Sequence, residues 1–219
     1  MSDRRDSTEL CDIAGKTQLH DISGKNDLLL HVCCGPCAQW PVKSLLEEGF
    51  TLTAFFSNPN IHPLFEQKRR RDNAAMLFHK RGIPFLEDGT YMEEKWLDKE
   101  WEGRYSSRCE MCYDIRMISA AQEAKRLGFT AFSTTLLVSP YQNHEAIIAA
   151  AQKAAAASGV EFVYRDFRPG FREGQTMAKN DGMYRQKYCG CIFSLEESAF
   201  KDKIYKSFAG SEGETRTVL

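Results

Sequence analysis

The chain has 219 residues, of which 42% are hydrophobic and 27% are charged, as in a soluble globule with its own core. A formal net charge of −1 excludes a bulk electrostatic attraction to nucleic acid, so any site for a polyanion must be a local patch. No apolar run reaches the roughly 18 to 20 residues that a bilayer span needs, and the N-terminal segment lacks a signal-peptide stretch. We therefore expect a cytoplasmic protein with no membrane association.

Residues 1–26 are polar without sustained periodicity and are predicted to form a flexible extension. Short apolar runs predict five strands, at 28–32, 52–56, 83–87, 129–135 and 161–167. Helical spacing predicts helices after residue 34, from Pro63 to about Gly82, at 112–127, at 143–158 and in a last short segment ending near Lys206.

The segments 88–108 and 168–186 are predicted to be irregular, and 207–219 is a polar tail. Strands alternate with helices, which predicts a single α/β domain over 27–206. Its expected architecture is a Rossmann-like parallel sheet with helices on both faces. In such sheets, ligands bind beyond the carboxyl ends of the strands.

Eight cysteines are the most informative residues, because clustered cysteines in a reducing compartment bind metal or perform redox chemistry more often than they form disulfides. Cys11 stands alone in the polar extension. The other seven fall into three groups: Cys33, Cys34 and Cys37; Cys109 and Cys112; and Cys189 and Cys191. The first group directly follows the first predicted strand, so groups distant in sequence can meet at one sheet edge.

The pairs Cys33–Cys34 and Cys109–Cys112 together offer four thiolates, the usual complement for a 4Fe-4S cluster. A four-cysteine zinc site would use the same ligands, but structural zinc usually supports small domains that lack a core of their own. The second pair alone would also fit a thioredoxin-like motif. We favour the iron–sulfur interpretation.

The segment Cys189-Gly190-Cys191 has a spacing that suits a redox-active pair, since glycine lets the backbone bend to bring the two sulfurs together. The alternative is that this pair binds a second metal, such as a mononuclear iron, together with Cys37. Cys37 itself is either a ligand or a buried residue near the cluster.

Basic and aromatic side chains are interleaved in the late loops that lead to Cys189, as in many RNA-binding surfaces. The candidate RNA contacts there are Arg165, Arg168, Arg172, Tyr184 and Arg185. The run from Lys68 to Arg71 is basic too, but a solvated helix face explains it equally well. His31 is expected in the core, and His62 and His144 are either proton donors or hydrogen-bonded structural residues. Asp114 either supports a metal ligand or is an acidic residue at the start of a helix.

The nucleotide-binding motifs GxGxxG and GxxxxGK(S/T) do not occur in the sequence, so we expect no use of ATP. No flavin or cobalamin motif is expected either. Two other function classes stay open on the residues alone. One is a metal-stabilised RNA-binding module without redox activity, and the other is a thiol–disulfide oxidoreductase.

Six segments resemble the cobalamin-independent epoxyqueuosine reductases: LLLHVCCGPC, SNPNIHP, RCEMCYDIR, FSTTLLVSPYQNH, DFRPGFR and YRQKYCGCIFS. They lie between Leu28 and Ser194, so the N-terminal extension falls outside the resemblance. The resemblance implies a fold similar to the adenine nucleotide alpha-hydrolases. It also implies that residues 27–206 are catalytic and reduce the epoxide of epoxyqueuosine in the tRNA anticodon loop to queuosine.

The resemblance further implies roles for the cysteine groups. Those matching Cys33, Cys34, Cys109 and Cys112 would hold a 4Fe-4S cluster. Cys189 and Cys191 would be the redox-active catalytic pair, and Cys37 occupies a position at which a second iron is an open alternative. An electron donor such as ferredoxin or flavodoxin would complete the reaction.

Overall fold

The computed structural model describes residues 26–212, which form an α/β structure around one parallel sheet. The strand order is β3-β2-β1-β4-β5, and every neighbouring pair is parallel. The strands are β1 (Asp27–His31), β2 (Thr51–Phe56), β3 (Phe85–Glu87), β4 (Ala131–Thr134) and β5 (Glu161–Phe162). The predicted sheet is therefore confirmed, with the first strand at its centre.

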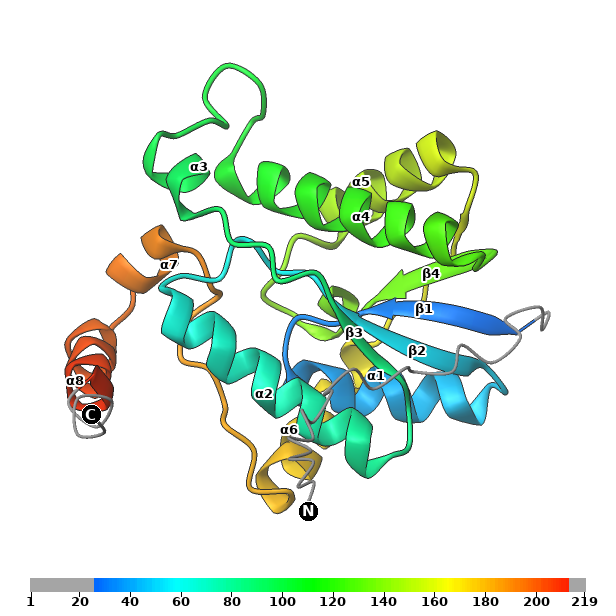
Figure 1. Cartoon of the computed structure of the whole chain (residues 1–219), viewed down its shortest axis with the longest axis horizontal. Helices are drawn as coiled ribbons and strands as arrows, with labels where there is room; N and C mark the ends of the chain where they lie inside the picture. Colours follow the sequence, from blue (N-terminus) through cyan, green and yellow to red (C-terminus); the bar gives the residue numbers. More distant parts are fainter. Residues whose placement is uncertain (1–25, 213–219) are drawn as a thin grey trace, which may run out of the picture.

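Helices cover both faces of the sheet, with α4 and α5 on one side and α1, α2 and α6 on the other (Figure 1). The helices are α1 (Gly35–Glu47), α2 (Leu64–Lys80), α3 (Glu93–Leu97), α4 (Arg108–Leu127), α5 (His144–Ser158), α6 (Phe171–Asn180), α7 (Ile192–Glu196) and α8 (Lys201–Glu212), with 3-10 turns η1 (Thr135–Val138) and η2 (Arg168–Gly170). Over residues 26–212, none of these helices is long and apolar enough to cross a membrane.

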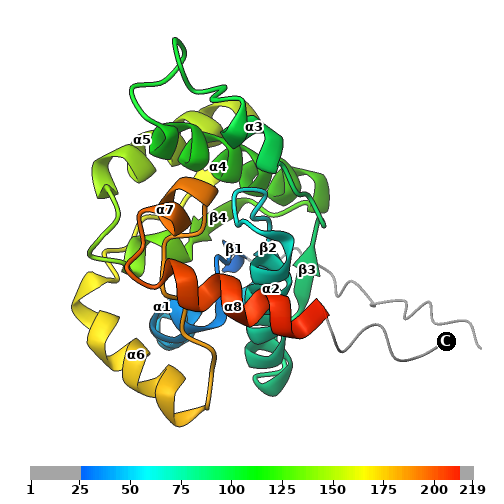
Figure 2. The ribbon, with the colours of Figure 1, turned by 90° about the vertical axis from the view of Figure 1, so that its left-hand side faces the viewer.

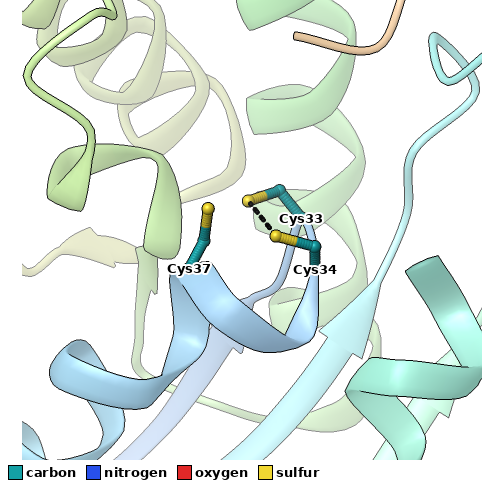
Figure 3. Close-up of side chains that lie close together, drawn as sticks. All are labelled: Cys33, Cys34 and Cys37. Carbon is teal, nitrogen blue, oxygen red and sulfur yellow. Dashed lines mark hydrogen bonds between the residues drawn. The ribbon is translucent and has the colours of Figure 1, made fainter. Parts of the chain in front are cut away.

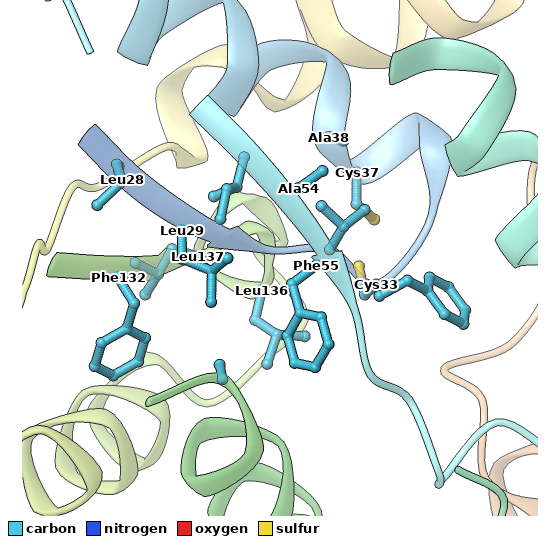
Figure 4. Packing of buried hydrophobic residues seen from close by; sticks show 14 of the residues in the cluster. Leu28, Leu29, Cys33, Cys37, Ala38, Ala54, Phe55, Phe132, Leu136 and Leu137 are labelled. Atoms are coloured by element: carbon cyan, nitrogen blue, oxygen red, sulfur yellow. The ribbon is translucent and has the colours of Figure 1, made fainter. Parts of the chain in front are cut away.

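The core forms around β1, whose Leu28, Leu29 and Leu30 are completely buried. Burial of each such side chain contributes about 1.5 to 3 kcal/mol. Figure 4 shows Leu28 and Leu29 packed near Phe132, with the sulfurs of Cys33 and Cys37 at one end of the same cluster. The core therefore continues without a break into the first cysteine group.

Helix α5 begins and ends as its sequence predicts. The side-chain oxygen of Asn143 accepts a hydrogen bond from the backbone nitrogen of Ala146 at 3.1 Å, which caps the first turn. Gly159 ends the helix with a φ of 75°, a left-handed conformation that glycine adopts at low cost. The cap at Asn143 fixes where the turn before α5 ends. In that turn, Gln142 contacts the sulfur of Cys189.

The structure differs from the sequence prediction in the segment 168–186, which is not a loop throughout. It contains η2 and α6, and Gly174 and Ala178 of α6 are buried where this helix packs on α1. Close helix packing explains the small residues, which had suggested a loop when their tertiary partner was unknown. The segment 88–108 likewise contains the short helix α3, whose Trp96 is fully buried.

Three element ends also differ from the prediction. The fifth strand has two residues instead of the seven expected, because after Phe162 the chain leaves the sheet through the exposed residues Tyr164, Arg165 and Asp166. Helix α4 begins at Arg108, four residues earlier than expected, and α8 continues to Glu212. The predicted extension over 1–26, with Cys11, lies outside the described residues except for Asn26.

Trp40 of α1 lies directly on η2 and α6, and this contact yields a stability prediction. A Cβ atom added at Gly170 would lie 1.9 Å from Cε2 of Trp40. We expect Gly170→Ala to lower the free energy of unfolding by about 1 to 3 kcal/mol through overpacking, measured by denaturant titration. Thr176→Ala, on the exposed side of α6, is the matched control and should change it little. Equal stability of Gly170→Ala and the wild type would contradict the packing described here.

Candidate metal and redox centre

The three cysteine groups meet at a cavity of about 540 Å³ beyond the carboxyl ends of the strands. Figure 2 looks onto this edge, where α7 and the segment before it pass in front of the strand ends. Cysteines from all three groups line the cavity: Cys33, Cys37, Cys109, Cys189 and Cys191. The expectation that distant groups meet at one sheet edge is therefore confirmed.

The first group occupies the connection from β1 to α1. Cys34 is the extended residue that precedes α1, and Cys37 lies in the first turn of that helix. The sulfurs of Cys33, Cys34 and Cys37 all lie within 4.8 Å of one another, and all three residues are buried (Figure 3). Three converging, buried sulfurs form a donor set suited to a thiophilic metal or an iron–sulfur cluster.

Hydrogen bonds among these three thiols shape their proton affinities. Those from Cys34 and Cys37 hold the pKa of Cys33 well below its ordinary value. Burial raises the pKa of Cys34, and the hydrogen bond to Cys33 raises that of Cys37. Ligation of a metal by all three sulfurs would require each of them to lose its proton.

The second group lies at the start of α4. Ser107 caps this helix by accepting a hydrogen bond from the backbone nitrogen of Glu110 at 3.3 Å. The spacing of three residues places Cys109 and Cys112 on the same side of the first turn. Cys109 is exposed and Cys112 is buried, and burial raises the pKa of Cys112 to about 12.

The third group is held by the N-terminal half of α2. The guanidinium of Arg70 donates hydrogen bonds to the carbonyl oxygens of Cys189 at 2.7 Å and Tyr188 at 3.1 Å. Glu66, one turn earlier, accepts from Nε of Arg70 at 2.7 Å, and this ion pair is almost fully buried. We call Glu66 and Arg70 the α2 clamp, because together they fix the backbone at Cys189.

Contacts from His62 support the same segment. Its backbone nitrogen donates to the carbonyl of Gly190 at 2.8 Å, and its Nδ1 accepts from the backbone nitrogen of Ile192 at 3.2 Å. The hydroxyl of Tyr188 donates to the carbonyl oxygen of His62. Burial lowers the pKa of His62, so the neutral ring, with Nε2 donating to Pro59, serves to hold the loop.

Gly190 meets both a conformational and a steric requirement. Its φ is 153°, and an added Cβ would lie 3.2 Å from Ile61 and 3.4 Å from the guanidinium of Arg70. The two flanking cysteines have different surroundings. Cys189 is exposed, and its sulfur accepts a hydrogen bond from Nε2 of Gln142 at 3.3 Å. Cys191 is buried in a cluster with Cys112.

Two buried arginines, Arg70 and Arg116, add positive charge beside the cysteines, and neither was identified from the sequence. Arg70 is the buried residue of the basic run from Lys68 to Arg71, and the sequence does not distinguish it from the others. Arg116 lies one turn after Cys112, with Nη1 3.8 Å from that sulfur and Nη2 2.7 Å from Oδ1 of Asn58. The spacing of four residues from Cys112 was the signal that could have identified Arg116.

The cavity lining is cationic although the whole chain carries a net charge of −1. Five cations line it, against the single carboxylate of Glu197: Arg70, Arg108, Arg116, Arg185 and Lys187. Glu197 forms an ion pair with Arg108 at 2.6 Å. The site therefore suits an anionic ligand.

The residues predicted to contact RNA lie at different distances from this cavity. Arg185 lines it. The guanidinium carbon of Arg69 lies 3.6 Å from the ring centroid of Tyr184, and the hydroxyl of Tyr184 donates a hydrogen bond to Glu66 of the α2 clamp. Arg165 and Arg168 form ion pairs with Glu48 and Asp166, respectively, and neither lines the cavity. Arg172 is exposed on α6 and does not line it either.

The remaining polar candidates have structural surroundings. His31 is buried, its ring nitrogens lie 2.8 Å from Oγ1 of Thr134 and 3.1 Å from the carbonyl oxygen of Ser57, and burial lowers its pKa to about 3. The expectation that it belongs to the core is confirmed. Asp114 pairs with Lys153 at 2.7 Å, which joins α4 to α5.

The chain matches the family model of epoxyqueuosine reductase QueH over residues 28–197. The epoxyqueuosine reductase QueH of Haemophilus influenzae is 36% identical over 194 residues, covering 85% of this chain and 78% of that protein. That of Thermotoga maritima is 38% identical over 179 residues, covering 78% of this chain and 91% of the relative.

Among solved structures, the U34-tRNA thiolase NcsA from Methanococcus maripaludis with its 4Fe-4S cluster shares the fold. Its TM-score is 0.50 at 16% identity, with 87% of this chain and 70% of that chain covered. This similarity concerns the fold alone. On the match over residues 28–197 and the identity to its relatives, the chain belongs to the epoxyqueuosine reductase QueH family of oxidoreductases.

Proposed function

We propose that this protein reduces the epoxide of epoxyqueuosine at the wobble position of tRNA, giving queuosine in the last step of that modification. The observation that supports it most is the cavity in which three cysteine groups and five cations meet, in a chain of this family. Sulfur ligands suit a redox metal centre, and cations suit an RNA backbone.

The donor set fits an iron–sulfur cluster. We propose Cys33, Cys34, Cys109 and Cys112 as its ligands. The sulfurs of Cys33 and Cys34 lie 3.9 Å apart, Cys109 lines the same cavity as Cys33, and Cys112 is buried in a cluster with Cys191, which also lines that cavity. Cys37 lies close enough to the first pair to be either a ligand there or part of a second mononuclear iron site. A bound 4Fe-4S cluster would supply electrons one at a time.

Cys189 and Cys191 are proposed to supply the electron pair. Removal of the epoxide oxygen as water breaks two C–O bonds and consumes two electrons and two protons. Two thiols provide both when they close to a disulfide, so the products are an alkene, water and a Cys189–Cys191 disulfide. Two one-electron transfers from a donor of the ferredoxin or flavodoxin class, with uptake of two protons, would then restore the dithiol. The competing proposal is that this pair binds a second metal.

The cavity lining also provides a place for the RNA backbone beside the thiol. Arg185 and Lys187 lie in the segment just before Cys189, so a phosphate backbone bound to them would lie beside the exposed thiol. The α2 clamp fixes the carbonyl of Cys189 at the same time. Substrate and thiol are therefore held from neighbouring positions of one short segment, which favours an oriented approach.

Anaerobically purified protein, supplied with a reductant and tRNA carrying epoxyqueuosine, should convert it to queuosine, measured by mass spectrometry of the released nucleosides. Alanine at Cys33, Cys34, Cys109 or Cys112 should each lower the iron and sulfide content and abolish conversion. Cys11→Ala is the matched control and should leave both near the wild-type level. Full iron content in one of the four variants would remove that residue from the ligand set, and no conversion by the iron-loaded wild type would refute the proposed function.

The two proposals for Cys189 and Cys191 predict different chemistry in the oxidised protein. A dithiol pair should give a Cys189–Cys191 disulfide on peptide mapping. Serine at either position should then stop turnover and leave the iron content unchanged. If the pair binds metal, the mapping should show no disulfide, and Cys191→Ser should lose iron beyond that of the cluster. The second pattern would replace the dithiol proposal.

Arg185 and Arg165 provide a matched test of where the RNA binds. Arg185→Ala should weaken tRNA binding and make its salt dependence shallower, because each lost phosphate contact releases up to one counterion fewer. Arg165→Ala should have a smaller effect, since Arg165 is paired with Glu48 away from the cavity. Fluorescence anisotropy at several salt concentrations measures both. A larger effect of Arg165→Ala would move the RNA-binding face from the cavity to the segment after β5.

A further inference from the structure

Tyr141 is an aromatic residue at the cavity whose side chain lies largely outside the core. Its side chain is 86% exposed, whereas the next most exposed large hydrophobic residue among those described, Leu97, is 56% exposed. It lines the cavity together with Cys189 and Gln142. The exposed ring is therefore accessible to a ligand that enters the cavity.

The turn that presents Tyr141 is tied to the cysteine wall. The backbone nitrogen of Tyr141 donates to Oγ of Ser139 at 3.3 Å. The next residue, Gln142, contacts Sγ of Cys189 at 3.3 Å and accepts a hydrogen bond from the hydroxyl of Tyr113 at 2.6 Å. The ring of Tyr141 is therefore placed relative to the exposed thiol by an adjacent residue.

Phe171 gives the exposed ring a lateral support. The two rings meet nearly at right angles, at 84°, with centroids 5.9 Å apart, and both residues line the cavity. Phe171 is the first residue of α6. This helix packs on α1, where Gly170 and Gly174 lie against the side chain of Trp40. With 86% of its side chain exposed, Tyr141 keeps open surface on which a planar ligand can stack.

The charge of the cavity identifies the kind of planar ligand. Arg108, Arg185 and Lys187 lie in the same lining as Tyr141, with the carboxylate of Glu197 as the one acidic group there. An aromatic platform beside several cations is the arrangement that binds single-stranded nucleic acid, with stacking for a base and cations for the phosphates. A purely apolar ligand would not use the cations.

We propose that Tyr141 is the stacking platform for the nucleobase of the wobble nucleoside whose epoxide ring is reduced. This inference rests on the proposed function and deepens it. The base stacks on the Tyr141 ring at the cavity, and the epoxide-bearing ring of the nucleoside extends toward Cys189. Gln142, the residue after Tyr141, contacts the sulfur of Cys189. Tyr141 acts as a specificity and positioning residue, and the thiols do the chemistry.

The test uses full-length, iron-loaded protein and two anticodon stem-loop RNAs, one with guanine at the wobble position and one with an abasic site there. Tyr141→Ala should weaken binding of the guanine RNA roughly tenfold, the range expected for one lost base–aromatic stack, while Tyr141→Phe keeps the ring and should stay within about twofold of wild type. Tyr164→Ala, a half-exposed tyrosine outside the cavity lining, is the matched control and should bind as wild type does.

The abasic RNA shows which nucleotide the ring contacts. If Tyr141 stacks on the wobble base, Tyr141→Ala and wild type should bind the abasic RNA equally, because the partner of the ring is already missing. An undiminished effect of Tyr141→Ala on the abasic RNA, or no effect on the guanine RNA, would overturn the inference. The proposed function fails separately, through absent conversion of epoxyqueuosine by a wild-type protein that still binds the guanine RNA.

Discussion

The arrangement of this protein depends on one topological constraint: all five strands are parallel, so every strand ends at the same edge of the sheet. The central strand β1 runs directly into Cys33 and Cys34, and its neighbour β4 runs into η1 and the turn that holds Tyr141. The start of α4 and the segment before α7 meet the same edge. Residues more than 150 positions apart, such as Cys33 and Cys189, therefore line one cavity.

Two buried cations lie at this edge, each held by specific partners. Arg70 and Arg116 are each almost fully buried, a costly position for a charge unless nearby groups offset it. Glu66 and two carbonyl oxygens do so for Arg70, which in turn fixes the loop of Cys189. For Arg116 the nearby groups are Asn58 and the sulfur of Cys112. Thiolates or an anionic cluster would add favourable charge at that position.

Much of the fold follows from sequence because its signals are local. The buried run from Leu28 to Val32, the cap at Asn143 and the stop at Gly159 each depend on neighbours within a few residues. Helix α6 was missed because the fit of Gly170 and Gly174 against Trp40 is a tertiary contact. The two-residue β5 was overestimated because an edge strand ends where the chain leaves the sheet, and hydrophobic periodicity does not report that.

The cysteine groups of the candidate site could be predicted from the sequence, but the individual side chains around them could not. Cysteine spacing identified the three groups, and the alternating pattern of strands and helices predicted that they would meet. The grouping of Cys37 with Cys33 and Cys34 is confirmed, because the three sulfurs lie together at the first turn of α1. Cysteine spacing did not decide whether Cys37 is a metal ligand. Nor did the sequence distinguish the buried Arg70 from the more accessible Lys68, Arg69 and Arg71, because which side of a helix is buried depends on tertiary packing. Tyr141 lies in the segment FSTTLLVSPYQNH that carries the family resemblance, but the sequence did not report that its side chain is exposed at the cavity.

The central claim is that the converging cysteines hold an iron–sulfur centre, and X-ray absorption at the iron and zinc edges of anaerobically purified protein tests it most directly. The account predicts iron surrounded by sulfur with a further shell of neighbouring iron atoms, as in a 4Fe-4S cluster. Zinc with four sulfur ligands and no iron would contradict it, and would make the cysteines a structural metal site.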